Sequence, residues 1–303
     1  DEVVIQSMET VAGEPLDVAT LDLEFVESGD LAFPSVQAST QAATRLSADA
    51  VVKASVAQAS RRFNVVGVSD FVQAAAESHL QGLSGSLAAA LPDLPALGDV
   101  RKFAQAAGEW VELVRNPAAL AASIAEALSV ADYIQRAADL RAVLGGLLVL
   151  ARSNPLASPP APSVSTLSRL QAWRNQVAVN GLARQVVLAQ AIGASSLVPA
   201  EVHDDVISLR NQIVAAIDEE TLAASDESYQ ALVAVRLAVW RDLTDRARGA
   251  GRLRTVRPPV PVPALVLSHR LYASAGRADE IVARNRVRHP GFVPASDLLV
   301  LST

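Results

Sequence analysis

The chain has 303 residues, enough to bury a sizeable core and to form two or three domains. Half of its residues are apolar but only 4% are aromatic, and the apolar excess is mostly Ala, Val and Leu, which favours helix. The absence of cysteine excludes disulfides and thiolate sites, and the net charge of -6 argues against extensive nucleic-acid binding by the whole chain.

Charge is distributed unevenly along the chain. Residues 1–30 hold nine acidic side chains and no basic one, whereas residues 252–290 hold eight arginines against Asp279 and Glu280. Such asymmetry suits head-to-tail contacts between protomers or a local anion-binding face. Two independently solvated surfaces would produce the same pattern, so the sequence leaves these alternatives open.

The first thirty residues predict a β segment. Residues 3–5 form a short β-branched run, and residues 20–27 alternate between apolar and acidic side chains. Two strands do not form a stable unit alone. We therefore expect residues 1–30 to be the end of an N-terminal domain whose remaining strands come from upstream sequence or from another chain.

Residues 35–152 predict a first helical domain. A long Ala-rich helix is expected up to about residue 62, with Ser35 or Ser39 as its N-cap, and a second helix is expected to be capped by Asp70. Gly and Pro residues predict a loop or a broken helix over 82–98. The remaining helices are predicted over 99–115, 117–128 and 130–151, with Pro117 in a first helical turn.

Residues 153–165 predict a proline-rich linker, and residues 166–250 a second helical domain. Four prolines fall within residues 153–162. Helices are expected over 166–194, 201–219 and 228–248, the last burying Leu232, Val235, Val239 and Leu243. We expect the three tryptophans to be core anchors: Trp110, Trp173 and Trp240.

The last segment, residues 257–303, predicts a small module of two helices and a closing strand. Residues 257–263 are proline-rich and extended, and the apolar run 298–301 is the expected strand. The overall expectation is a mainly α protein: an Ala-rich helical body with a short N-terminal β segment and a small α/β module at the C-terminus.

No motif in the chain predicts catalysis, a cofactor or a metal site. The four histidines are far apart in sequence and form no zinc-binding spacing, and phosphate-binding glycine loops are absent. The acidic run 218–220 is interpreted as a solvated helix end. We expect no enzyme activity, although a buried Asp204, Glu219 or Glu220 beside a pocket would favour a glycan-cleaving carboxylate pair.

Three alternating arginines in the terminal segment are the strongest candidates for a contact surface. On a helix ending near Asn285, these cations would complement the helix dipole. In an extended loop they would line one side and could bind phosphates, or they could form salt bridges to an acidic partner. The full set of candidate partner or DNA contacts is Arg252, Arg254, Arg257, Arg277, Arg284, Arg286, Arg288 and His289.

The same terminal residues carry a family resemblance. Residues 265–272 (LVLSHRLY), 277–280 (RADE) and 283–294 (ARNRVRHPGFVP) resemble the C-terminus of Mu-like phage DNA circularisation (DNA circulation) proteins. Weaker similarity is found upstream, in residues 21–29 and 63–72. The terminal module also resembles LysM-type modules, but its only candidate for an opening strand is residues 260–263, where prolines disfavour a central strand.

The resemblance implies a phage virion structural protein. It would be a hub or adaptor between the tail tube and the baseplate of a contractile Mu-like tail, in the virion and, during assembly, in the host cytoplasm. Its partners would be other tail proteins and further copies in a three- or six-fold ring, with residues 1–30 ending a tube- or hub-like domain and no helix spanning a membrane. The alternative is a protein that binds DNA ends through the basic module and circularises injected phage DNA non-covalently.

Overall fold

The computed structural model describes residues 3–12, 19–27, 39–90, 100–130, 134, 137, 139–153, 156–163 and 166–302. The chain divides into two compact units, Asp1–Ser39 and Thr40–Thr303. Helices dominate the described residues, so the predicted mainly α class is confirmed. The strands form two separate two-stranded antiparallel sheets.

The first unit is a β-hairpin built from β1 (Val3–Ala12) and β2 (Ala19–Glu27). The antiparallel register pairs Ile5 with Phe25 and Met8 with Leu23, with a bulge between Ile5 and Ser7. Both predicted strands are therefore confirmed, and the first is longer than its β-branched run indicated. The completion of a larger sheet by other strands stays a prediction, and Ser35 lies outside the described residues.

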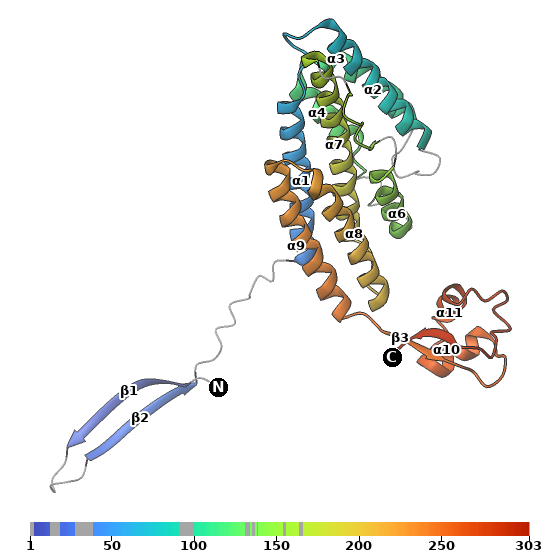
Figure 1. Cartoon of the computed structure of the whole chain (residues 1–303). Helices are drawn as coiled ribbons and strands as arrows, with labels where there is room; N and C mark the ends of the chain where they lie inside the picture. The colour runs from blue at the N-terminus through green and yellow to red at the C-terminus, as the bar shows by residue number, and fades with distance from the viewer. Residues whose placement is uncertain are drawn as a thin grey trace. The chain divides into compact units, whose positions relative to one another are not determined.

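The second unit contains a body of helices around one hydrophobic core (Figure 1). Helix α7 runs through its centre, and α1 packs against both α7 and α9, while α8 packs against α9. The bounds of these helices are α1 Thr40–Arg62, α7 Leu167–Ser195, α8 His203–Ala223 and α9 Asp226–Arg248. The predicted apolar face of α9 is buried as expected, at Leu232, Val235, Val239 and Leu243.

The remaining helices of the body are α2 Asp70–Ala90, α3 Val100–Glu112, the short 3-10 helix η3 Leu113–Arg115, α4 Pro117–Ala127 and α6 Leu140–Ala151. Local capping sets several of these boundaries. Asn116 accepts a hydrogen bond from the backbone N–H of Ala119, with Pro117 in the first turn as predicted. Asp139 accepts from two backbone N–H groups at the start of α6.

Three predicted boundaries in this region are wrong. Helix α2 continues through Gly82 and Gly85 to Ala90, so the predicted loop over 82–98 does not begin at Gly82, and residues 91–99 lie outside the described part. Helix α2 also begins at Asp70 itself rather than after it. The helix predicted over 130–151 is interrupted: residue 134 is helical, residues 137 and 139 are not, and α6 begins at Leu140, where the Asp139 side chain caps it.

The proline-rich segment packs on the body rather than separating two domains. Leu156 is fully buried, the Trp173 Nε1–H donates to the carbonyl of Pro159 at 2.9 Å, and the Asn180 amide donates to the carbonyl of Ala157 at 2.6 Å. Helices from both sides of the segment contribute to one continuous core. The two predicted helical domains, 35–152 and 166–250, thus share a single hydrophobic interior.

The tryptophan prediction is correct for one residue and wrong for another. Trp110 is fully buried, and Trp173 is half-buried against the proline-rich segment. Trp240 is 45% exposed, on the side of α9 next to the buried stripe. The spacing of residues along a helix shows which of them share an apolar side. Which apolar side becomes buried depends on where the neighbouring helices pack.

The C-terminal module has its own small core and begins earlier than predicted. Its elements in chain order are β3 Leu253–Val256, α10 Ala264–Tyr272, α11 Ala278–Arg284 and β4 Leu298–Leu301. Strands β3 and β4 pair in antiparallel register, with Arg254 opposite Val300. The opening strand is therefore residues 253–256 and not the proline-containing residues 260–263, of which only Val262 makes an isolated bridge, to Val293.

Helix α7 is the one helix among the described residues that is long and apolar enough to cross a membrane. In its most apolar stretch, 72% of the residues are buried inside the helical body. Burial of that kind is also typical of the central helix of a globular core.

Candidate functional site

The candidate arginines of the module are positioned by three different elements. Arg252 and Arg254 are two residues apart at β3 and both are exposed, as alternation along a strand requires for residues on one face. Arg277 immediately precedes α11 and stacks on the Tyr272 ring, with 5.0 Å from its guanidinium carbon to the ring centroid. Arg257 is exposed and donates to the carbonyl of Ala295 at 3.3 Å.

Arg284 is an internal ion-pair partner rather than a free contact residue. Its guanidinium lies 3.4 Å from a carboxylate oxygen of Glu280 and 3.7 Å from one of Asp205, and its side chain is only 19% exposed. Asp205 is at the start of α8 and also pairs with Arg141 at 3.1 Å. Arg284 therefore joins the module to the acidic first turn of α8.

The three alternating arginines do not line one side of an extended segment. Helix α11 ends at Arg284 with Asn285 as its C-cap, which is the first of the two arrangements considered from the sequence. Arg286 then adopts a left-handed backbone conformation with φ of 50°, so the chain turns between Arg284 and Arg288. The Asn285 side chain fixes this turn to β4 by bonding the N–H and the carbonyl of Leu299 at 2.8 and 2.9 Å.

A strongly positive surface remains after these internal contacts are counted. Residues 252–302 contain eight arginines and only three acidic residues, and one of these acids, Glu280, is paired with Arg284. His289 is exposed and lies near Phe292, with ring centroids 5.5 Å apart. The side chains of five exposed arginines of the module make no ion pair, hydrogen bond or ring contact with any described residue: Arg252, Arg254, Arg270, Arg286 and Arg288.

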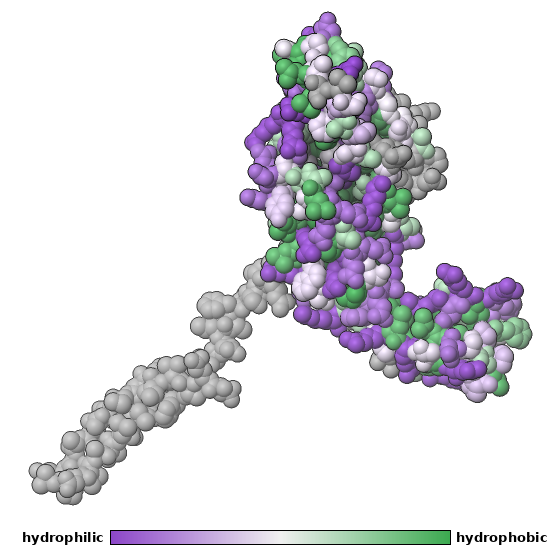
Figure 2. Space-filling model, viewed as in Figure 1, coloured by the Kyte–Doolittle hydropathy of each residue, from purple (hydrophilic) through white to green (hydrophobic). Residues whose placement is uncertain are grey.

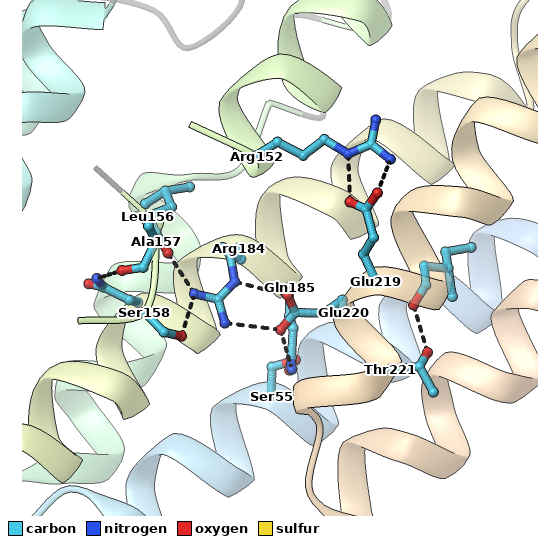
Figure 3. A network of polar contacts seen from close by, with 12 residues as sticks. Ser55, Arg152, Leu156, Ala157, Ser158, Arg184, Gln185, Glu219, Glu220 and Thr221 are labelled. Atoms are coloured by element: carbon cyan, nitrogen blue, oxygen red, sulfur yellow. Dashed lines mark hydrogen bonds and ion pairs between the residues drawn. The ribbon is translucent and has the colours of Figure 1, made fainter. Parts of the chain in front are cut away.

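A second polar cluster, in the helical body, lines a cavity of about 380 Å³. At its base, Arg184 of α7 donates to both carboxylate oxygens of Glu220 of α8, at 2.9 and 3.4 Å (Figure 3). The same guanidinium donates to the carbonyl of Leu156 at 2.6 Å and to the Ser158 hydroxyl at 3.2 Å. Gln185 donates a third hydrogen bond to Glu220 at 3.0 Å. The network thus ties the proline-rich segment to α7 and α8.

The predicted solvated acidic run is only partly solvated. Asp218 and Glu219 are exposed and pair with Arg236 and Arg152 at 2.6 and 2.8 Å, and the contact with Asp218 raises the pKa of Arg236. Glu220 is instead buried, which the sequence did not indicate. Glu219 and Glu220 both line the cavity, but each is engaged by a guanidinium. Each of these two carboxylates is therefore held by an arginine, Glu219 by Arg152 and Glu220 by Arg184.

The histidines do not converge in the structure. His203 begins α8 and its Nδ1 lies 2.9 Å from the carbonyl of Ala247, while His269 is exposed in the module. His79 lies 2.8 Å from Asn180 Oδ1, and burial lowers its pKa from the ordinary value of 6.5. Within the described part of the chain, no group of three or more His, Asp or Glu residues is arranged to hold a metal ion.

An apolar face on α9 is a feature that sequence reasoning missed. The surface of the helical body is mostly polar but is interrupted by apolar areas (Figure 2). Four apolar side chains of α9 are between 44% and 50% exposed: Tyr229, Val233, Leu237 and Trp240. Their spacing of four, four and three residues puts them on one side of the helix. In the sequence, this face can be recognised as a second series of apolar residues at helical spacing, beside the buried series of α9.

No protein-family model matches the chain, and no curated protein matches it.

Proposed function

We propose that the chain is a phage virion structural protein, a hub or adaptor at the junction of tail tube and baseplate that assembles through protein–protein contacts. The observation that supports it best is the exposed apolar face of α9, which we call the α9 stripe: Tyr229, Val233, Leu237 and Trp240. Four large apolar side chains in one row are a contiguous surface, unlike apolar residues scattered singly. Contiguous apolar surface of this kind is typical of interfaces.

The second support is the family resemblance of residues 265–294 to Mu-like DNA circularisation proteins of phage tails. The polar clusters agree with a role in assembly, because the buried Arg184–Glu220 pair and its exposed neighbours connect helices and leave no free carboxylate pair in the cavity. The LysM-like character of the module is part of the same proposal. Its β3–α10–α11–β4 order agrees with it, since an opening strand is present at residues 253–256.

The test is to ask where the protein resides. Tail particles would be sedimented from a lysate of the source cells and probed with an antibody raised against the chain. Immunogold electron microscopy would then locate the label. Label at the junction of tube and baseplate is the expected result. A chain that remains in the supernatant while intact tails sediment would contradict the proposal.

A second candidate function, DNA-end binding by the basic module, is favoured by the five exposed arginines whose side chains make no ion pair, hydrogen bond or ring contact with any described residue. Backbone phosphates are bound by such cations with release of counterions, so the affinity falls with salt in proportion to the number of phosphate contacts. The overall acidity of the chain, with a pI of about 5.3, limits this binding to the module.

Binding of a short duplex DNA over a salt series tests this second candidate. Replacing both Arg286 and Arg288 with alanine should weaken binding to all sequences alike and reduce the salt slope by about two. The matched control is Arg236→Ala, which removes an exposed arginine that is paired within the helical body. Equal salt slopes for the wild type and the double variant, or equal loss with the control, would remove DNA from the list of partners.

A further inference from the structure

The α9 stripe is the second apolar side of a helix whose first side is already buried. The buried side carries Leu232, Val235, Val239 and Leu243, and two stripe residues, Val233 and Trp240, directly follow members of that series. Helix α9 therefore carries a second apolar side beside the buried one, which is more than a helix at the edge of a body needs. The stripe runs from Tyr229 to Trp240 in steps of four, four and three residues, which is the spacing of an 11-residue helical repeat.

The described residues leave the stripe about half exposed, and its C-terminal end is held in a defined geometry. The Arg210 guanidinium lies 5.7 Å from the Trp240 ring centroid and donates to the Thr244 hydroxyl at 2.9 Å. These contacts from α8 orient the indole without burying it. An apolar side chain that is already ordered loses little conformational entropy on binding, so Trp240 at this end of the stripe is preorganised for a partner.

Charges at the two ends of the stripe select the partner. Asp226 precedes the stripe and Arg241 follows it; both are exposed, and neither forms an ion pair with a described residue. If two copies of α9 pack in opposite directions, Asp226 of each copy meets the region of Arg241 of the other. If the copies pack in the same direction, like charges face each other. For these two residues, opposite charges meet across the contact only in the antiparallel direction.

We infer that α9 pairs with α9 of a second copy of this chain in an antiparallel, two-fold contact, centred on Val233 and Leu237. The inference rests on the proposed function, since it names the partner of a surface assigned to assembly. In such an isologous contact each residue occurs twice and the contact closes at two copies. A ring of three- or six-fold order would require another surface in addition to the α9 stripe.

The first experiment measures the mass of the full chain by sedimentation equilibrium over a wide concentration range. The wild type should be a dimer, and Leu237→Glu should weaken dimerisation by about a hundredfold, since each central apolar residue contributes about tenfold and occurs twice. The matched control is Leu46→Glu, on α1, whose leucine is 70% exposed outside the stripe and should have no effect. A monomeric wild type, or equal loss in both variants, would overturn the inference.

The second experiment tests the antiparallel direction by exchanging charges. Asp226→Arg and Arg241→Asp should each weaken the dimer by severalfold, because each places like charges together across the contact. The double variant restores opposite charges and should regain most of the wild-type affinity. A double variant as weak as the single ones would contradict the antiparallel pairing even if the chain dimerises.

The outcomes separate this inference from the proposed function. A chain that dimerises through the α9 stripe but is missing from tail particles supports the pairing and contradicts the tail assignment. A chain that is monomeric in solution but located at the tube–baseplate junction supports the tail assignment and overturns the pairing.

Discussion

The ion pair between Arg184 and Glu220 gives the sharpest prediction about what holds the helical body together. Only 14% of the Arg184 side chain and 10% of the Glu220 side chain are exposed, so solvent screens their interaction weakly. Arg184→Met keeps the length of the side chain but removes the donors to Glu220, Leu156 and Ser158. The buried carboxylate then retains only the bond from Gln185. Loss of one partner of a buried pair costs about 3–5 kcal/mol of unfolding free energy.

Urea unfolding followed by far-ultraviolet circular dichroism measures this cost. The matched control is Arg236→Met, which breaks the pair with Asp218, where the two side chains are 46% and 51% exposed. Because solvent screens that pair, its loss should cost less than about 1 kcal/mol. The double variant Arg184→Met with Glu220→Met should recover most of the stability, since apolar residues can replace a buried pair.

Two results would refute the reasoning behind this prediction. If Arg184→Met costs no more than Arg236→Met, the network does not stabilise the contact between α7, α8 and the proline-rich segment. If the double variant is as unstable as Arg184→Met alone, the cost does not come from an uncompensated charge on Glu220.

Three further predictions concern single residues. Burial lowers the pKa of His79, so the unfolded chain binds a proton before the folded chain does as the pH falls, and the wild type should lose stability below about pH 6.5. In His79→Gln this loss should be absent. Urea unfolding of both proteins at several pH values would measure it. Trp110→Phe removes a buried Nε1–H that has no hydrogen-bond partner among the described residues, and losing this unsatisfied donor should offset part of the cost of the cavity that the smaller ring leaves. The loss of stability on urea unfolding should therefore stay below about 2 kcal/mol, and a cost of about 3 kcal/mol or more would contradict this. Asn285→Ala should destabilise the module by about 2 kcal/mol, because the two hydrogen bonds to Leu299 are lost. Hydrogen exchange at the Leu299 amide should then become faster. Unchanged exchange would show that the Asn285 side chain does not hold the turn to β4.

The sequence by itself determined most helix positions and one buried face. The helix predicted over 166–194 is confirmed as α7, and in the structure the Thr166 side chain caps its first turn by accepting from the N–H of Arg169. Pro117 similarly marks a first turn, and glycines end α9. These signals are local, acting within a few residues, so they can be identified before the fold is known. The apolar series of α9 from Leu232 to Leu243 was also identified correctly, because helical periodicity shows which residues share a face.

Tertiary structure alone decided which faces are covered and which charges are paired. Trp240 lies on an apolar series of α9 that stays about half exposed, whereas the series from Leu232 to Leu243 is buried in a helix that packs against α1 and α8. Glu220 resembles its neighbours Asp218 and Glu219 in sequence but is buried, because Arg184 of a distant helix lies opposite it. Arg284 pairs with Asp205, and residues 253–256 become a strand, only because partners far along the chain lie beside them. Such contacts depend on how elements pack, and periodicity, which describes each element separately, carries no information about its neighbours.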